Sequence, residues 1–294
     1  MQSNVLTELF LPLALALIML GMGLSLVTAD FKRIVLYPKA VALGILNQIV
    51  LLPIIAWLIV LAFGLSNELA VGIIILAACP GGPTSNLIAH LSRGDTALSI
   101  TLTVVSSAIA VFTIPFLVNL AILHFIPDGQ EQVLPIFKTI VSVIIITIIP
   151  VALGMGIRSR FPAFAARLER PVRILSAVFL FLIIGAALAK EKENLGEFFR
   201  LAGPATLLLN LLTMGVGYGT ARLGQLSTKQ SLTIAIESGI QNGTLGIAIA
   251  STLLQNAAMS VPSAIYSLLM FLTSIGIILL GNKIIDQKIP SGAA

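Results

Sequence analysis

The chain has 294 residues, of which 57% are hydrophobic and only 10% are charged, and its mean hydropathy is +1.07. A soluble domain is about a quarter charged, so this composition excludes an ordinary soluble protein. Apolar runs of about 20 residues recur along the chain, long enough to cross a bilayer as helices. We therefore expect an all-α polytopic membrane protein, with the lipid bilayer as its main surroundings. The net charge of +5 does not indicate nucleic-acid binding, because membrane topology accounts for it.

Nine transmembrane helices are predicted, and together they make residues 1–294 a single transmembrane domain. The short loops between them make consecutive helices antiparallel, and an odd number places the two termini on opposite sides. The stretch 158–173 alternates basic and apolar residues, and we interpret it as an amphipathic cytoplasmic linker at the lipid headgroups. The predicted spans are residues 5–28, 38–63, 69–92, 96–123, 133–157, 170–189, 200–222, 229–257 and 260–282.

The basic residues predict the orientation, because lysine and arginine are enriched in cytoplasmic loops. Thirteen of the 17 basic residues fall in the loops on the side that holds the C-terminus. The other four are Lys138, Lys190, Lys192 and Arg200. We therefore expect a multi-pass protein of the inner (plasma) membrane, with its N-terminus outside and its C-terminus in the cytoplasm.

The third predicted span is interrupted by "CPGGPTSN", residues 79–86. Proline lacks a backbone donor, and glycine weakens a helix by about 1 kcal/mol relative to alanine. The flanks, 69–79 and 83–92, each reach only about 15 Å at 1.5 Å per residue, half of the hydrocarbon core. Neither flank can span alone, so a loop between two separate spans does not fit. We expect one broken helix, whose irregular backbone lines a cavity or is packed in protein.

A second interruption is predicted in "AIESGIQNGTLG", residues 235–246. Glu237 is the only acid well inside a predicted span, where an unpartnered charge costs about 2.5–3.5 kcal/mol or more. A structural glutamate bonded to a neighbouring helix is the alternative interpretation. The glycines and amides around Glu237 favour a polar site instead.

The two interrupted spans run in opposite directions and occupy matching places along the chain. The pairs formed by spans 1 and 6, 2 and 7, and 4 and 9 are opposed in the same way, whereas 133–157 has no counterpart. This order fits an inverted-topology repeat with two discontinuous helices crossing near the midplane. Residues 1–126 would form the first repeat, with four helices, and residues 127–294 the second, with five.

The groups freed at these breaks favour binding of a cation and an anion. Backbone and side-chain oxygens suit hard cations such as sodium, and Glu237 supplies one full negative charge. Ser99 and Thr103 share a helix face, although serines on such a face can also serve close helix packing. Half-helix N-termini near Thr84 and Asn242 would face an anionic solute. The chemistry predicts a cation-coupled anion carrier, with the identity of both ions left open.

The motifs "CPGGPTSN" at 79–86, "RGDTALS" at 93–99 and "ESGIQNG" at 237–243 resemble those of the bile acid:sodium symporter family. The resemblance covers nearly the whole chain and is to the nine-helix variants. It implies a core domain with helices in 38–123 and 200–282. It also implies a panel domain that moves against the core, with helices 5–28, 133–157 and 170–189.

The resemblance further implies two sodium sites and one substrate site. The first sodium site would comprise Ser85, Asn86, Ser99, Thr103 and Glu237. The second would comprise Gln48, Glu237 and Gln241, with backbone carbonyls near Ser238 and Ile240; an interhelical hydrogen bond is the other interpretation of Gln48. The substrate would contact Pro83, Thr84, Asn242 and Gly243. The chain departs from the family at Pro83 and at Met270–Phe271, both near the expected substrate surface.

We therefore predict a sodium-coupled symporter of an organic anion that works by alternating access, and not an enzyme. The substrate would be bile-acid-like or a small carboxylate, such as a pantothenate-type or 2-oxo acid, and the protein would function as a monomer. One alternative is a proton-coupled or uncoupled carrier of the arsenite or auxin-efflux type, with Glu237 as the proton carrier. The other is a non-transporting membrane receptor, against which the lack of a sizeable soluble output domain argues.

Overall fold

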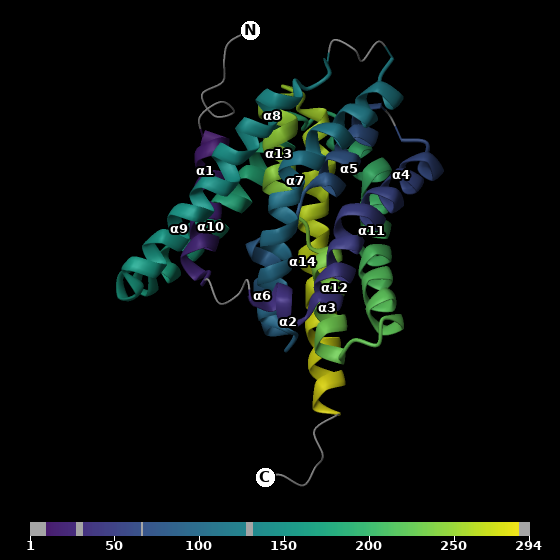
Figure 1. Ribbon diagram of the computed structural model, residues 1–294. Coiled ribbons are helices and arrows are strands. Elements are labelled where there is room, and N and C mark those ends of the chain that lie inside the picture. The colour runs from purple at the N-terminus through teal and green to yellow at the C-terminus, as the bar shows by residue number, and fades with distance from the viewer. Residues whose placement is uncertain (1–9, 28–31, 66, 128–131, 288–294) are drawn as a thin grey trace.

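The computed structural model describes residues 10–27, 32–65, 67–127 and 132–287. Within these ranges the chain is helical, and the only β pairing is one isolated bridge (Figure 1). Helices long and apolar enough to cross a membrane cover Pro38–Phe63, Thr96–Phe125, Ile136–Arg160, Pro162–Lys190, Leu195–Leu223 and Ala258–Asp286. Shorter apolar helices cover Leu11–Ser25, Asn67–Ala78 and Gly243–Leu253. The prediction of an all-helical chain with several membrane-spanning helices is confirmed.

The elements follow the predicted spans closely, with some long helices divided by wider π-helical turns. Part of the predicted first span, residues 5–9 and 28, lies outside the described residues. In chain order the elements are α1 (Leu11–Ser25), α2 (Lys32–Leu36), α3 (Pro38–Leu46), η3 (Asn47–Leu51), α4 (Leu52–Phe63), α5 (Asn67–Ala78), α6 (Pro83–Leu91), α7 (Thr96–Phe125), α8 (Ile136–Val143), η5 (Ile144–Ile148), α9 (Ile149–Arg160), α10 (Pro162–Lys190), α11 (Leu195–Leu223), α12 (Thr228–Gly239), α13 (Gly243–Ala248), η6 (Ile249–Leu253), η7 (Ala258–Ser260) and α14 (Val261–Asp286).

Two of the π-helical turns end just before a proline. η3 is followed by Pro53 and η5 by Pro150, each at the second position of the next helix. A proline has no N–H to donate, and its ring collides with the carbonyl four residues earlier; a wider turn relieves this crowding. In η3 the wider turn contains Asn47 and Gln48, both of which are buried.

Both predicted interruptions are present, and they lie against each other. α5 ends at Ala78 and the helix resumes as α6 at Pro83, while α12 ends at Gly239 and resumes as α13 at Gly243. Gly81 and Gln241 form the antiparallel bridge, and the Asn242 N–H donates to the Pro80 carbonyl at 2.9 Å. In Figure 1, α5 and α13 lie in the upper half of the bundle and α6 and α12 in the lower half. The two broken helices therefore cross at their breaks.

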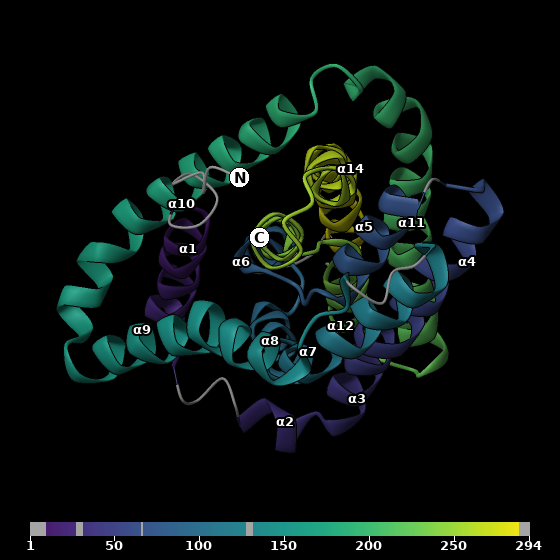
Figure 2. The same cartoon turned by 90° about the horizontal axis from the view of Figure 1, so that it is seen from above.

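Helices α1, α9 and α10 pack together on one side of the molecule. α1 contacts both α9 and α10, and Figure 2 shows the three at the left, apart from α4, α11 and α12. Glycines allow the close approach of α1 and α9: a Cβ atom on Gly154 would lie 2.7 Å from the backbone nitrogen of Leu24.

Residues 158–173, which we interpreted as a linker between two spans, lie almost entirely within the two flanking helices. α9 continues to Arg160, and α10 begins at Pro162, so only Phe161 separates the two helices. Proline is favourable in the first helical turn because the N–H it lacks would be unpaired there. Most of the expected linker is therefore the N-terminal part of a 29-residue helix.

Candidate functional site

Glu237 lies in a buried cluster of oxygen-bearing side chains from three helices, which we call the carboxylate cluster. It contains Glu237 of α12, Ser85 and Asn86 of α6, and Ser99 and Thr103 of α7. The Ser99 hydroxyl donates to Oε1 of Glu237, and the Thr103 hydroxyl lies 3.0 Å from Oε2. Asn86 Oδ1 lies 2.9 Å from the Ser99 hydroxyl and 3.2 Å from that of Thr103. The Ser85 and Thr103 hydroxyls are 3.4 Å apart. The structure thus brings together all five residues predicted for the first sodium site.

The carboxylate cluster has more acceptor oxygens than protons. Each hydroxyl carries one proton, yet Ser99 lies within hydrogen-bond distance of both Asn86 Oδ1 and Glu237 Oε1. Thr103 faces Asn86 Oδ1, the Ser99 carbonyl and Glu237 Oε2. These acceptors cannot all receive a proton at once. A monovalent cation among them would satisfy the excess oxygens.

Among the described residues, no cationic side chain balances the charge of Glu237. Only 3% of the residue is exposed, and in the described part of the chain no lysine, arginine or histidine forms an ion pair with it. A buried ionised carboxylate without a counter-charge is strongly unfavourable. The cluster is therefore chemically suited to a bound cation or a proton.

Two of the residues predicted for the second sodium site, Gln48 and Gln241, form an amide cluster with the main-chain carbonyls of Cys79, Glu237 and Ser238. Gln48 Nε2 lies 2.7 Å from Gln241 Oε1 and 3.0 Å from the carbonyl of Cys79. Gln241 Nε2 donates to the Ser238 carbonyl at 2.9 Å and to the Glu237 carbonyl at 3.4 Å. Gln241 lies beyond the end of α12 at Gly239, and its side chain extends toward the last turn of that helix to reach these carbonyls.

The structure divides Glu237 between the two clusters. Its carboxylate faces the hydroxyls of Ser99 and Thr103 in the carboxylate cluster. Its main-chain carbonyl accepts from Gln241 in the amide cluster. Ile240 lies in the break, where its N–H donates to the Ile236 carbonyl at 2.8 Å.

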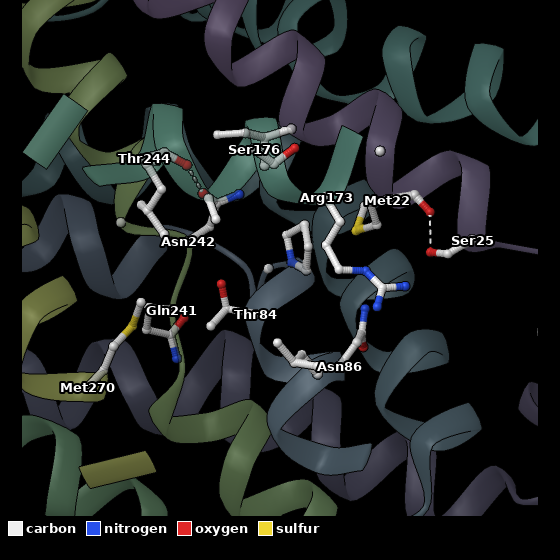
Figure 3. Close-up of a pocket in the computed structure, with 18 of the residues that line it drawn as sticks. Met22, Ser25, Thr84, Asn86, Arg173, Ser176, Gln241, Asn242, Thr244 and Met270 are labelled. Atoms are coloured by element: carbon white, nitrogen blue, oxygen red, sulfur yellow. Dashed lines mark hydrogen bonds between the residues drawn. The ribbon is translucent and has the colours of Figure 1, made fainter. Parts of the chain in front are cut away.

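A cavity of about 470 Å³ lies beside the crossing of the broken helices, and Figure 3 shows part of its lining. The four residues predicted to contact the substrate all line it: Pro83, Thr84, Asn242 and Gly243. Asn242 also begins α13, because its side chain accepts from the Leu245 N–H at 3.1 Å and from the Thr244 hydroxyl at 2.7 Å.

Sequence reasoning missed the wall of the cavity formed by α10. Glu169 and Arg173 line the cavity and form an ion pair with each other, and Ser176 lies one turn further on. Figure 3 shows Arg173 extending into the same cavity as Thr84 and Asn86. The residues 169, 173, 176 and 180 share one helix face, and that periodicity could have revealed this lining. Met270 and Phe271 complete the wall, and Phe271 stacks on Phe181 with ring centroids 5.7 Å apart.

An all-helical membrane protein in which two broken helices cross beside a polar cluster has the architecture of an ion-coupled transporter. The comparison with known families is more specific. A family model described as "Sodium Bile acid symporter family" matches residues 12–198. The chain belongs to this family, which consists of sodium-dependent transporters and not of enzymes.

Curated relatives match most of the chain at about 30% identity. The "Uncharacterized sodium-dependent transporter YocS" of Bacillus subtilis is 30% identical over 258 residues, 88% of this chain and 78% of the relative. The rice "Probable sodium/metabolite cotransporter BASS2, chloroplastic" is 29% identical over 261 residues, 88% of this chain and 60% of its own. The human "Sodium/bile acid cotransporter 4" is 31% identical over 245 residues, 82% of this chain and 55% of its own.

Proposed function

We propose that this protein is a sodium-coupled symporter that imports a small organic anion by alternating access across the plasma membrane, working as a monomer. The observation that carries the proposal is the carboxylate cluster. It places one buried charge and several neutral oxygens from three helices at the crossing of two broken helices. The family provides independent support for sodium.

Two sodium ions would bind, one in the carboxylate cluster and one in the amide cluster. One would lie among the carboxylate of Glu237, Ser85, Asn86, Ser99 and Thr103. The other would lie beside Gln48 and Gln241, with the carbonyls near Ser238 and Ile240 as further ligands. Glu237 would serve the first site through its carboxylate and the second through its main chain, so the two ions would be coupled through one residue.

The architecture we propose is nine spans arranged as two inverted repeats, residues 1–126 and 127–294. The opposed broken helices, α5–α6 and α12–α13, support this arrangement. A panel of α1, the α8–α9 helix and α10 would move against a core formed by the remaining spans. The packing of α1 against both α9 and α10 supports this division.

In the orientation we propose, the cavity opens toward the cytoplasm. Beyond the breaks and Met270–Phe271, its lining comes from the C-terminal half of α1, the length of α6, the N-terminal turns of α7 and the middle of α10. The helix ends on that side carry many of the basic residues, among them Arg93 and Arg160, and basic residues mark the cytoplasmic face. The conformation is then inward-facing, with the cavity as the exit path.

The cavity suits an organic anion that has an apolar body. Its volume of about 470 Å³ is typical of a small-molecule site, and such sites combine apolar walls with a few polar groups. Phe181, Phe271 and Met270 supply apolar surface. Arg173 supplies a positive charge, for which a substrate carboxylate would compete with Glu169, its ion-pair partner. A small carboxylate is the substrate class we favour.

Uptake into proteoliposomes tests the function directly. Purified protein is reconstituted, an inward sodium gradient is compared with a choline gradient at fixed pH, and a panel of labelled organic acids is offered. We expect at least one acid to accumulate only with sodium. Accumulation driven by a pH gradient without sodium would support a proton-coupled carrier, and binding without accumulation would support a receptor; either result would overturn the proposal.

Replacing Arg173 by glutamine should weaken anion binding selectively. A hydrogen bond to a charged group contributes about 1.5–3 kcal/mol, and solvent screens part of it because Arg173 is 61% exposed in its side chain. We expect the half-saturating anion concentration to rise about three- to tenfold, with the sodium-induced rise in melting temperature unchanged. Arg170→Gln, on the same helix but outside the cavity lining, is the matched control. Equal effects of the two variants would exclude a role for Arg173 in the site.

A further inference from the structure

The carbonyl of Gly239, the last residue of α12, is held by two fully buried side chains. Asn210 of α11 donates from Nδ2 at 2.6 Å, and Tyr266 of α14 donates from its hydroxyl at 2.7 Å. The two side chains also contact each other, with Asn210 Nδ2 3.2 Å from the Tyr266 oxygen. Neither residue exposes any surface. The end of the first half of the broken helix is thus tied to two neighbouring spans.

A similar contact exists at the other break. Gln48, in the helix before α5–α6, donates to the carbonyl of Cys79 at 3.0 Å, and Cys79 directly follows the last residue of α5. Asn210, in the helix before α12–α13, donates to the last carbonyl of α12. In each broken helix, an amide from the preceding span therefore holds the carbonyl where the helix ends. Gln48 is a proposed sodium ligand, whereas no role has been given to Asn210.

The held carbonyl lies between two proposed ligands of the second sodium site. Gly239 is flanked by Ser238 and Ile240, and its carbonyl lies in one rigid peptide plane with the Ile240 N–H. Holding that plane restrains the dihedral angles of Gly239 and Ile240, through which the carbonyls of Ser238 and Ile240 are directed. The last carbonyls of a helix have no partner within the helix. Two donors hold the carbonyl of Gly239. The carbonyl of the preceding residue, Ser238, therefore stays directed toward Gln241 Nε2, at 2.9 Å.

Asn210 contributes through its N–H group alone. Its Oδ1 is buried and has no hydrogen-bond partner among the described residues. A buried acceptor without a partner is destabilising, so an apolar side chain of similar shape would remove that penalty and offset part of the loss of the Nδ2 hydrogen bonds. The donor to Gly239 is the feature that an asparagine provides here.

We propose that Asn210, together with Tyr266, is a positioning residue of the second sodium site: it fixes the carbonyl of Gly239 and thereby the carbonyls of Ser238 and Ile240. This inference rests on the sodium coupling proposed above. Neither side chain touches the ion; each acts through the backbone of the break. Partners of this kind commonly change metal affinity about 10- to 100-fold when they are removed.

The test measures sodium dependence in Asn210→Leu and Tyr266→Phe. Both substitutions nearly preserve shape, and each removes one donor from the Gly239 carbonyl. We expect the half-saturating sodium concentration for uptake to rise about tenfold in each single variant and further in the double variant. The uptake rate at saturating sodium should stay within about twofold of the parent, because the ligands themselves remain. The melting temperature without sodium should change little in the single variants, where one donor to the Gly239 carbonyl remains, and should fall in the double variant, where both are removed.

Thr206→Val is the matched control. Thr206 is equally buried one turn earlier in α11, and among the described residues its hydroxyl bonds within that helix alone, to Ala202 at 2.7 Å and Gly203 at 3.0 Å. A lower melting temperature with unchanged sodium half-saturation in both test variants would show a merely structural role and overturn the inference. If Asn210→Leu fails to fold, Tyr266→Phe decides the question alone. A parent protein without any sodium response would instead refute the proposed function.

Discussion

Replacing Glu237 by glutamine should abolish sodium-driven uptake at ordinary sodium concentrations. The substitution keeps the shape and one acceptor oxygen but removes the charge that faces Ser99 and Thr103. A cation in this buried cluster would then lack its counter-charge, and charge interactions are strong where the effective dielectric constant is low. The part of the sodium-induced thermal stabilisation that comes from the first site should vanish too, because a ligand stabilises only the state that it binds; the second site, which uses only the main chain of residue 237, keeps its smaller share. In the parent the first-site part is worth about 2.7 kcal/mol at a sodium concentration 100-fold above Kd.

Melting temperature against sodium concentration, for parent and variant, separates the possible roles of Glu237. A structural glutamate predicts lower stability with the sodium shift of the parent retained in full, which would contradict our assignment. A proton carrier predicts a parent without any sodium shift and loss of pH-driven uptake in the variant. Glu68→Gln, which removes an acid from the first turn of α5, controls for the change in net charge and should behave like the parent.

Replacing Gly81 by alanine should disrupt the first sodium site by steric means. A Cβ atom on Gly81 would lie 2.7 Å from Oε2 of Glu237 and 3.4 Å from the Ser85 hydroxyl. The backbone at Gly81 does not have a positive φ, so alanine is not strained by its conformation and the effect comes from the displaced carboxylate. We expect the half-saturating sodium concentration to rise at least about tenfold, the size of effect seen when a metal ligand is misplaced.

The neighbouring glycine provides a close control. A Cβ atom on Gly82 would lie 3.6 Å from the Cβ of Asn242, an ordinary van der Waals distance, and Gly82 has a φ of −135°. Gly82→Ala should therefore keep the sodium response of the parent in the same titration. Similar sodium dependence in the two alanine variants would mean that the carboxylate does not occupy its position during ion binding.

The interruptions could be predicted from the sequence because their causes are local. Pro80 and Pro83 remove backbone donors, and the flanking apolar runs are too short to cross a membrane. The meeting of the two breaks depends on residues about 160 positions apart, and only the symmetry of the spans and the family resemblance indicated it. The resemblance likewise provided the five residues of the carboxylate cluster, which the structure brings together.

Other parts of the site could not be predicted in this way. Arg173 lies near the end of an apolar run, where a basic residue is usually explained by the lipid headgroups, so its place in the cavity wall was missed. Asn210 is a single amide in an apolar helix, and its role depends on a carbonyl 29 residues away. Two of the π-helical turns, η3 and η5, arise from the crowding ahead of Pro53 and Pro150, which span prediction by hydropathy does not register.

The bridge between Gly81 and Gln241 also has a consequence for biosynthesis. Gln241, the partner of Gly81, lies 160 positions later in the chain. At a rate of synthesis of about 5–20 residues per second, Gln241 is therefore made roughly 8–32 s after Gly81. Until then the unwound backbone of the first break lacks the partner that pairs with it, in a medium that offers no water as a substitute. The nascent chain should therefore depend during that interval on the translocon, a chaperone or residual water to shelter the break.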